Sequence, residues 1–378
     1  MTEPAPPTGR AAAGPADAID PARPVLFVTT EVPPDRVGAF RALAELIPVE
    51  FALFGGGLHA TGGVDDHGLP VRKVTQREVH GLAASGRYSA VVAGTVGRTA
   101  LPAAWLGAER ARVPFLLWTA LWAHPRSVAH APGALLLRLL YRRAAAVVTY
   151  GDHVSRFAAL HGARHTTVAP QAVDQAFWTI DDDTARETAR PRRLVYVGRD
   201  DPGKGVDWLL RAWDASGLGT PPSPGAAPPA ELRLIGPEPR RAAGHAGVVS
   251  LGPLAPARVR EELSAAAAIV VPSERTATFR EPWGLVVNEA MHAGALVIAS
   301  TEVGAAAGGL VVDGRTGLVV ASGDTNGLAR ALQRAAAPET PQMQGIRRAG
   351  QAAARAYTQQ AWASAFADQV TRSLAWRA

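Results

Sequence analysis

The segment Gly198-Arg199-Asp200-Asp201-Pro202-Gly203-Lys204-Gly205 places two cations among glycines, directly after the short apolar run Leu194 to Val197. The residues that follow, Val206 to Trp213, have a helical pattern. A strand, a glycine loop and a helix in this order predict a phosphate-binding site. Glycines let the backbone approach the ligand, free N–H groups face it from the helix start, and cations neutralise its charge. Arg199 and Lys204 are the candidate cations.

This loop has two other interpretations. Gly198 and Gly203-Lys204 have the G-x-x-x-x-G-K spacing of nucleoside triphosphatases, but Gly205 stands where that motif needs a magnesium-binding Ser or Thr. The adjacent Asp200 and Asp201 are also unusual beside phosphate. A surface loop with solvated cations would explain the same residues without any ligand.

A second group of residues runs from Glu281 to Glu289, with seven residues between the two carboxylates and Gly284 inside. The glycine precedes a helical segment, so backbone N–H groups near Gly284, Leu285 and Val286 are expected to face an anion or a polar ligand. Simpler roles are a helix-dipole contact for Glu289 and a local ion pair of Glu281 with Arg280.

The Glu281/Glu289 pattern resembles the E-x7-E motif of retaining GT-B glycosyltransferases of the family-4 kind, the glycosyl transferases group 1. Gly198-Arg199 and Lys204-Gly205 resemble the second signature of that family. The resemblance covers about Leu194 to Asp324, whereas the first half is similar only in pattern. It implies a GT-B fold, in which two doubly wound Rossmann-like domains face a cleft.

The family's chemistry assigns a role to each matching residue. The donor is a nucleotide-diphosphate sugar, and catalysis needs neither a cofactor nor a metal, because cations stabilise the leaving diphosphate. Retention is described as front-face attack, in which the leaving phosphate helps to take the acceptor proton. The resemblance implies the following roles: Arg199 and Lys204 at the diphosphate, Glu281 at the transferred sugar, Glu289 at the ribose hydroxyls, and Gly198, Gly284, Leu285 and Val286 around the donor.

The chain departs from this family in two loops. Glu274 to Arg280 lengthens the segment before Glu281 and makes Glu274 a competitor for the first acidic role. The family's Gly-Gly loop after the first strand is replaced by Thr29 to Gly38, where Arg36 and Gly38 could meet the donor phosphates. The acceptor is therefore not predicted.

Candidate acceptor-side residues follow the next strand ends. Trp122 and His124 lie in the segment Trp118 to Arg126, and His153 follows Tyr150-Gly151-Asp152. Aromatic faces suit sugar rings and histidine can orient a hydroxyl. Both tryptophans of the first segment could equally be core residues.

The elements that must position these residues recur along the chain as short β-rich runs separated by helical segments. The expected strands are Val25 to Val28, Phe51 to Phe54, Ala90 to Ala93, Phe115 to Trp118, Ala146 to Tyr150, Leu194 to Val197, Leu232 to Ile235, Ile269 to Val271, Val297 to Ala299 and Leu318 to Val320. This alternation predicts parallel sheets, whose strand ends carry ligand sites.

We expect a disordered leader over 1–23, an acceptor-side domain over 24–172, a linker over 173–193 and a donor domain over 194–357. A C-terminal helix over 358–378 is expected to pack back on the first domain. A length of 378 residues agrees with two domains.

The composition of the chain restricts the kinds of partner and location that we expect. The net charge of +6 is spread along the chain without dense Lys/Arg blocks, so no nucleic-acid partner is expected. There is no cysteine, which excludes disulfides and thiolate metal sites. The first 23 residues lack an apolar core like that of a signal peptide, and a cytoplasmic location is expected. Ala134 to Arg143 combines leucines with three arginines, which suits either peripheral contact with the inner face of the membrane or a buried helix with a basic edge.

Two other function classes are considered. A nucleotide-sugar-binding protein without catalysis would share the fold, and donor hydrolysis would distinguish it. An NAD-dependent oxidoreductase is suggested by the doubly wound pattern and Gly55-Gly56-Gly57, but that run lacks the G-x-G-x-x-G spacing.

Overall fold

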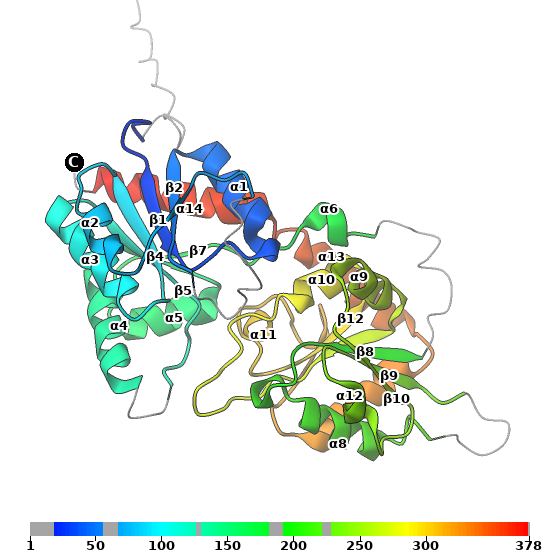
Figure 1. The fold of residues 1–378 in the computed structure, drawn as a ribbon. Coiled ribbons are helices and arrows are strands. Elements are labelled where there is room, and N and C mark those ends of the chain that lie inside the picture. Colours follow the sequence, from blue (N-terminus) through cyan, green and yellow to red (C-terminus); the bar gives the residue numbers. More distant parts are fainter. Residues whose placement is uncertain (1–18, 56–66, 126–129, 181–191, 221–227, 377–378) are drawn as a thin grey trace, which may run out of the picture.

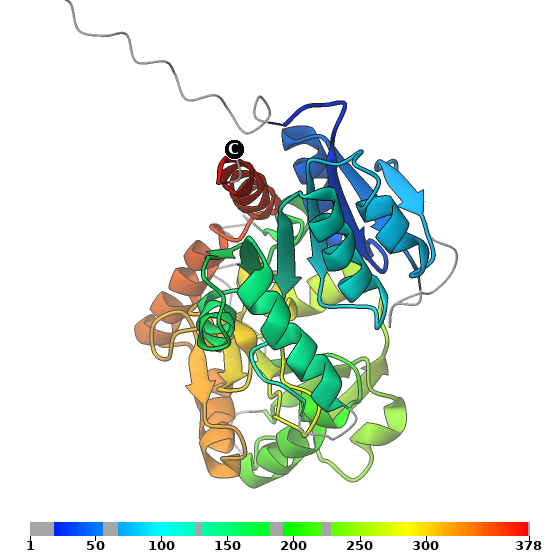
Figure 2. The ribbon, with the colours of Figure 1, turned by 90° about the vertical axis from the view of Figure 1, so that its left-hand side faces the viewer.

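The computed structural model describes residues 19–55, 67–125, 130–180, 192–220 and 228–376. These residues form two parallel α/β sheets, one in each half of the chain (Figure 1). Figure 2 shows the two domains one above the other. The expected fold class, two doubly wound domains facing each other, is confirmed.

The N-terminal sheet has seven strands in the order β3-β2-β1-β4-β5-β6-β7. Most of its strand residues are apolar and buried on both faces, which is typical of parallel sheets covered by helices. Its strands are β1 (Val25–Thr29), β2 (Val49–Leu53), β3 (Val71–Lys73), β4 (Ala90–Gly94), β5 (Phe115–Thr119), β6 (Ala146–Thr149) and β7 (Thr166–Val168), and its helices are α1 (Val37–Leu46), α2 (Glu78–Ala83), α3 (Ala100–Ala111), α4 (Ala131–Arg143) and α5 (Asp152–Leu160).

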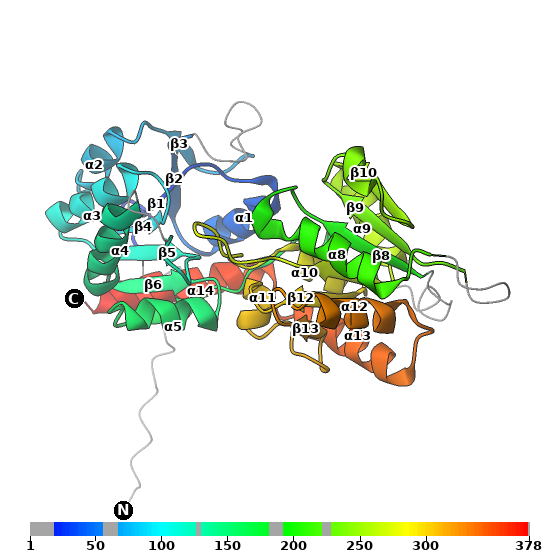
Figure 3. The same cartoon turned by 90° about the horizontal axis from the view of Figure 1, so that it is seen from below.

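One face of this sheet is completed by the C-terminal helix α14 (Gln359–Ala375), which packs beside α1. Figure 3 shows this helix along the N-terminal sheet although the chain arrives there from the second domain. Phe366 lies 5.6 Å from Phe27 between ring centroids, and Trp362 stacks on Phe40 at 5.5 Å. The apolar stripe of the terminal segment is therefore part of the first domain's core.

The C-terminal sheet has six strands in the order β10-β9-β8-β11-β12-β13. Helices cover both of its faces, and the short helix α6 precedes it. The strands are β8 (Arg193–Val197), β9 (Glu231–Ile235), β10 (Val248–Gly252), β11 (Ala268–Val271), β12 (Leu296–Ser300) and β13 (Leu318–Val320), and the helices are α6 (Gln175–Trp178), α8 (Val206–Ser216), α9 (Pro256–Ala265), α10 (Val286–His292), α11 (Gly304–Ala307), α12 (Thr325–Ala336) and α13 (Pro341–Ala354).

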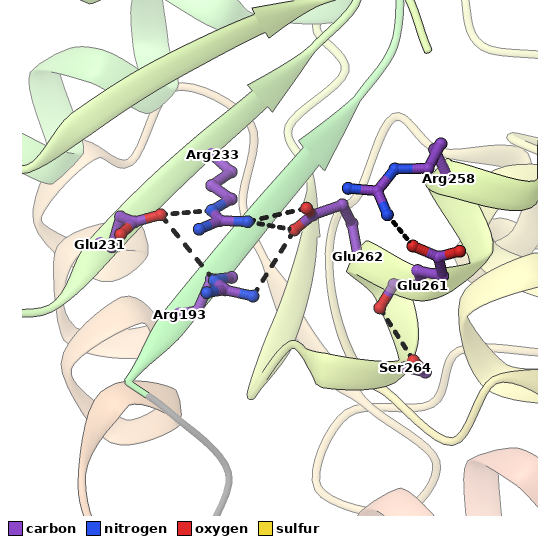
Figure 4. A network of polar contacts seen from close by, with 7 residues as sticks. All are labelled: Arg193, Glu231, Arg233, Arg258, Glu261, Glu262 and Ser264. Carbon is purple, nitrogen blue, oxygen red and sulfur yellow. Dashed lines mark hydrogen bonds and ion pairs between the residues drawn. The ribbon is translucent and has the colours of Figure 1, made fainter. Parts of the chain in front are cut away.

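A buried carboxylate connects α9 with two strands of this sheet. Glu262 accepts hydrogen bonds from Nη1 of Arg233 at 2.7 and 2.8 Å, and Arg193 lies 3.6 Å away (Figure 4). Glu231 completes the group. Two guanidinium groups compensate the charge that burial of Glu262 would otherwise leave unpaired.

The structure corrects the predicted elements at the sheet edges and at the leader. Strands β3, β7 and β10 were not expected; β3 and β7 are the two edges of the N-terminal sheet, and β10 is one edge of the C-terminal sheet. Ile19 is buried in the N-terminal core, and Arg23 donates to the carbonyl of Tyr88 at 3.1 Å, so packing begins before the predicted end of the leader. The rest of the predicted leader, most of the linker from 181 to 191, and Gly56-Gly57 lie outside the described residues.

No helix within the described ranges is long and apolar enough to cross a membrane.

Candidate active site

A cavity of about 370 Å³ lies at the carboxyl ends of the strands of the C-terminal sheet and is bounded by residues of the N-terminal domain. The loop after β8, the loop after β11 and the start of α10 supply most of its wall. Its lining residues are Arg36, Tyr150, Tyr196, Val197, Gly198, Lys204, Val271, Pro272, Ser273, Glu281, Pro282, Trp283, Gly284, Leu285, Val286 and Glu289. The two sequence motifs therefore meet in one site.

Gly205 brings the first motif against the second. It has a φ of +73°, and a Cβ atom there would lie 1.8 Å from the carbonyl oxygen of Pro272. The loop after β8 thus packs backbone to backbone against the loop after β11. Neither Ser nor Thr fits at this position, so the nucleoside-triphosphatase interpretation fails on geometry as well as on residue type.

Lys204 and Glu281 form the charged centre of the cavity. The Lys204 Nζ atom donates to Oε2 of Glu281 at 2.5 Å, and the Ser273 hydroxyl donates to the same oxygen at 3.1 Å. Glu281 is buried, so this pair is largely shielded from water. No donor from the described residues contacts Oε1, which leaves one oxygen of a firmly held carboxylate for a ligand hydroxyl.

The alternative of a local ion pair between Glu281 and Arg280 was wrong. Arg280 pairs with Glu302, at 2.6 Å between Nε and Oε2, and its guanidinium lies 3.3 Å from the ring centre of Trp122. The side chain of Arg280 therefore points to the N-terminal domain, whereas Lys204 compensates Glu281.

Two of the three acceptor-side candidates hold the backbone at Glu281. The Trp122 indole N–H donates to the carbonyl of Glu281 at 3.0 Å, and His153 Nε2 lies 3.2 Å from the carbonyl oxygen of Pro282. Burial lowers the pKa of His153 to about 4, so the ring is neutral at pH 7 and Nε2 carries the proton. Neither residue lines the cavity. Both connect the two domains beneath it.

The third candidate, His124, also lies outside the cavity. Its ring packs 5.0 Å from Phe157 and 4.8 Å from His161 of the α5 region. Burial lowers its pKa, and the neighbouring His161 and Arg138 act in the same direction. This environment is that of a packed neutral histidine.

Arg36 is the cation that the N-terminal domain adds to the cavity. It is buried, with its guanidinium 5.7 Å from the Trp118 ring and 5.3 Å from the Tyr150 ring, and it donates to Oε1 of Gln171. The backbone carbonyl of Gln171 accepts a hydrogen bond of 2.8 Å from Asn288 on α10. Arg36 is therefore fixed relative to the second motif. Gly38 does not line this cavity.

Glu289 on α10 lines the same cavity with an unusually basic carboxylate. Burial, and to a smaller extent the negative charge of Asp35 across the cleft, raises the pKa of Glu289 to about 7. No side-chain hydrogen bond to this carboxylate comes from the described part of the chain. The nearby backbone N–H groups of Gly284, Leu285 and Val286 likewise have no acceptor there. The carboxylate can accept hydrogen bonds from a ligand, and the backbone N–H groups can donate hydrogen bonds to the same ligand.

Arg199 is not brought into the cavity. Its side chain is 55% exposed and pairs with Asp201 at 3.1 Å, while its carbonyl accepts a hydrogen bond from the Tyr196 hydroxyl. Glu274, the competitor for the first acidic role, does not line the cavity either. Gly198, Lys204, Glu281 and Glu289 do, together with Gly284, Leu285 and Val286.

Sequence reasoning did not find Tyr150, Tyr196, Ser273 and Trp283 as lining residues. Tyr150 and Ser273 lie just beyond strand ends, which is a usable signal in a parallel sheet. Tyr196 lies inside a strand and Trp283 resembles core, so neither carried a signal of its own.

The fold defines the class of protein. The structure resembles HepE of Anabaena in complex with UDP, with a TM-score of 0.71, 19% identity, and coverage of 92% of this chain and 100% of that one. It also resembles a glycosyltransferase of Rickettsia africae (TM-score 0.68, 13% identity, 93% and 98% covered). A trehalose 6-phosphate synthase of Burkholderia multivorans gives a TM-score of 0.67, with 14% identity and coverage of 93% and 97%. These likenesses establish the GT-B fold.

A sequence match to a known family lies in the second half of the chain. Residues 191–337 match the family model of the glycosyl transferases group 1. The C-terminal domain is therefore similar in sequence to this family, and the whole chain has the GT-B fold. The search of curated proteins found no match.

Proposed function

We propose that this protein is a retaining, metal-independent glycosyltransferase that transfers a sugar from a nucleotide-diphosphate sugar to an acceptor not yet identified. The observation that carries the proposal is the single cavity in which Lys204, Glu281 and Glu289 meet the free backbone N–H groups of the Gly284 turn. The combination offers cations for a diphosphate, acceptors for hydroxyls and donors for phosphate oxygens.

Lys204 and Arg36 approach the cavity from opposite domains. As the glycosidic bond breaks, negative charge grows on the leaving diphosphate, and preplaced cations stabilise it. Each side chain is already held in place, Lys204 by Glu281 and Arg36 by Gln171 and two aromatic rings. Arg199 joins them only when its guanidinium leaves Asp201.

The two glutamates bind hydroxyls of the donor. Oε1 of Glu281 is the free acceptor for a hydroxyl of the transferred sugar, because Lys204 and Ser273 occupy Oε2. Glu289 accepts from the ribose hydroxyls, and those two donors restore the charged form that burial disfavours in the empty site.

Retention and independence of metal follow from the same proposal. The donor's own phosphate takes the acceptor proton, and two fixed cations replace a metal at the diphosphate, so no cofactor is needed. Proton NMR of the sugar first released on slow donor hydrolysis is expected to show the anomer of the donor. EDTA is expected to leave the hydrolysis rate unchanged. Release of the opposite anomer, or loss of activity that a divalent ion restores, would refute this part of the proposal.

A uridine diphosphate sugar is the first donor to test. The HepE structures contain UDP or UDP-glucose, and they share the fold of this chain. The experiment is release of nucleotide diphosphate from UDP-glucose by the wild type and by Lys204→Ala. Turnover in the wild type that falls about ten- to a few hundred-fold in the variant supports catalysis. Binding without release in either protein would favour the silent binding protein.

Peripheral contact with an anionic membrane is proposed for α4 of a cytoplasmic enzyme. Its outer face shows Leu135, which is 67% exposed, and Leu139 beside the exposed Arg138 and Arg142, while Leu140 and Tyr141 are buried. The spacing of three and four residues places those leucines and arginines on one side, which suits an interface rich in anionic lipid.

Vesicle sedimentation tests the membrane contact. Each basic residue near such a surface contributes about 1 kcal/mol. Replacing Arg138, Arg142 and Arg143 by Gln should therefore abolish sedimentation with phosphatidylglycerol vesicles, and neutral phosphatidylcholine vesicles serve as the control. Undiminished sedimentation of the triple variant would discard the membrane contact.

A further inference from the structure

The loop after β8 carries charges of the wrong sign for a diphosphate site. Asp200 and Asp201 lie between Gly198 and Lys204, and Asp207 follows in the first turn of α8. All three carboxylates are partly exposed. Without compensation, they would repel a bound diphosphate and compete for Lys204.

Arg241 compensates two of these carboxylates at once. Its Nε lies 3.0 Å from Oδ2 of Asp200, and one of its terminal nitrogens donates to Oδ1 of Asp207. Arg199 pairs with the third, Asp201, at 3.1 Å. A planar guanidinium can hold two carboxylates in fixed directions, which an ammonium group cannot do equally well.

Arg241 lies in the connection that follows β9. This connection is in backbone contact with the loop after β8. Arg241 lies in the short 3-10 helix η5 (Pro239–Ala242), which follows β9. Gly236, at the end of β9, has a φ of +110°, and a Cβ atom there would lie 2.1 Å from the carbonyl oxygen of Gly198. The connection after β9 thus supports the loop that presents Lys204.

We propose that Arg241 is a positioning residue for the donor diphosphate, a role that rests on the proposed function. By bridging Asp200 and Asp207 it fixes the loop from Gly198 to Gly205 between β8 and α8. It also cancels the charge of Asp200 in front of the phosphates. It does not line the donor cavity and does not touch the reacting atoms.

The test compares Arg241→Ala with Arg240→Ala by titration of the full-length protein with UDP-glucose. Arg240 is the adjacent residue, is 79% exposed and pairs only with Glu238 among the described residues. We expect Arg241→Ala to weaken donor affinity about tenfold, because Asp200 and Asp207 both lose this partner and Asp200, inside the loop, then faces a doubly charged group. Arg240→Ala should stay within twofold of the wild type.

Rescue separates this electrostatic role from general damage to the fold. Adding Asp200→Asn to Arg241→Ala removes the unpaired charge inside the loop, leaves only that of the more exposed Asp207 on α8, and should restore affinity to within about threefold. The defect of the single variant should also shrink in 0.5 M salt, because exposed charges are screened. A loss that neither change reduces would overturn the inference, as would wild-type affinity in Arg241→Ala.

Asp200→Asn in the wild-type background provides a second test if Arg241→Ala does not fold. It should leave donor affinity unchanged or slightly improved, and a tenfold loss would overturn the inference. Failure of the wild type to bind any nucleotide sugar would instead remove the proposed function and this inference with it. Wild-type binding with unaffected Arg241 variants removes only the inference.

Discussion

Replacement of Glu289 by Gln should make the ligand-free protein more stable than the wild type at alkaline pH but not at acid pH. Burial raises the pKa of this carboxyl from 4.5 to about 7. The folded state therefore holds the proton more tightly than the unfolded state, and the wild type loses stability as the pH rises from about 4.5 through 7. Each unit of difference between the pKa in the folded state and that in the unfolded state corresponds to about 1.4 kcal/mol. The loss reaches at most about 3 kcal/mol and is complete above pH 7.

Urea unfolding from pH 4.5 to 8.5 measures this difference. Glu289→Gln cannot ionise, so its free energy of unfolding should exceed that of the wild type by up to about 3 kcal/mol at pH 8 and match it near pH 4.5. Glu238→Gln, at a largely exposed position, is the matched control and should show no pH-dependent gain. A constant difference between Glu289→Gln and the wild type at all pH values would refute the reasoning.

The remaining predictions concern the occupied site and its support. Donor affinity of the wild type should increase as the pH rises from 5.5 to 8, because hydroxyl donors favour ionised Glu289, whereas Glu289→Gln should show no such trend in calorimetric titrations. Lys204→Ala should lower the donor hydrolysis rate about ten- to a few hundred-fold, and a rate within twofold of wild type would exclude Lys204 from the chemistry. Trp122→Phe removes the hydrogen bond to the Glu281 carbonyl and should slow hydrolysis about two- to tenfold with little change in melting temperature; an unchanged rate would exclude that support.

The sequence predicted the central strands and the edge strand β13 well, but it missed the edge strands β3, β7 and β10. Strands such as β1 and β4 are buried on both faces, so almost all of their residues are apolar and they stand out in the sequence. The edge strands β3 and β7 read Val-Arg-Lys and Thr-Thr-Val and are mostly exposed or partly buried, which leaves no apolar run to recognise. Edge strands are paired on one side only, and polar residues are tolerated there.

The site was predictable where both partners of a contact carry a recognisable motif. Lys204 and Glu281 were each found from spacing, although their direct contact was not. The role of Trp122 was not predictable, because its indole meets a backbone carbonyl 159 positions later in the chain. Arg199 was predicted to line the site and does not. The sequence indicates its charge, but it does not show that Asp201 holds the side chain away from the cavity.

The most direct test of the account is a thermal-shift panel of UDP, GDP, ADP, dTDP and CDP sugars against the wild type, Lys204→Ala and Glu289→Ala. The account predicts that at least one donor raises the melting temperature of the wild type and that the same donor has little effect on either variant. Folded wild-type protein that no donor stabilises, or variants stabilised as strongly as the wild type, would contradict nucleotide-sugar binding in this cavity.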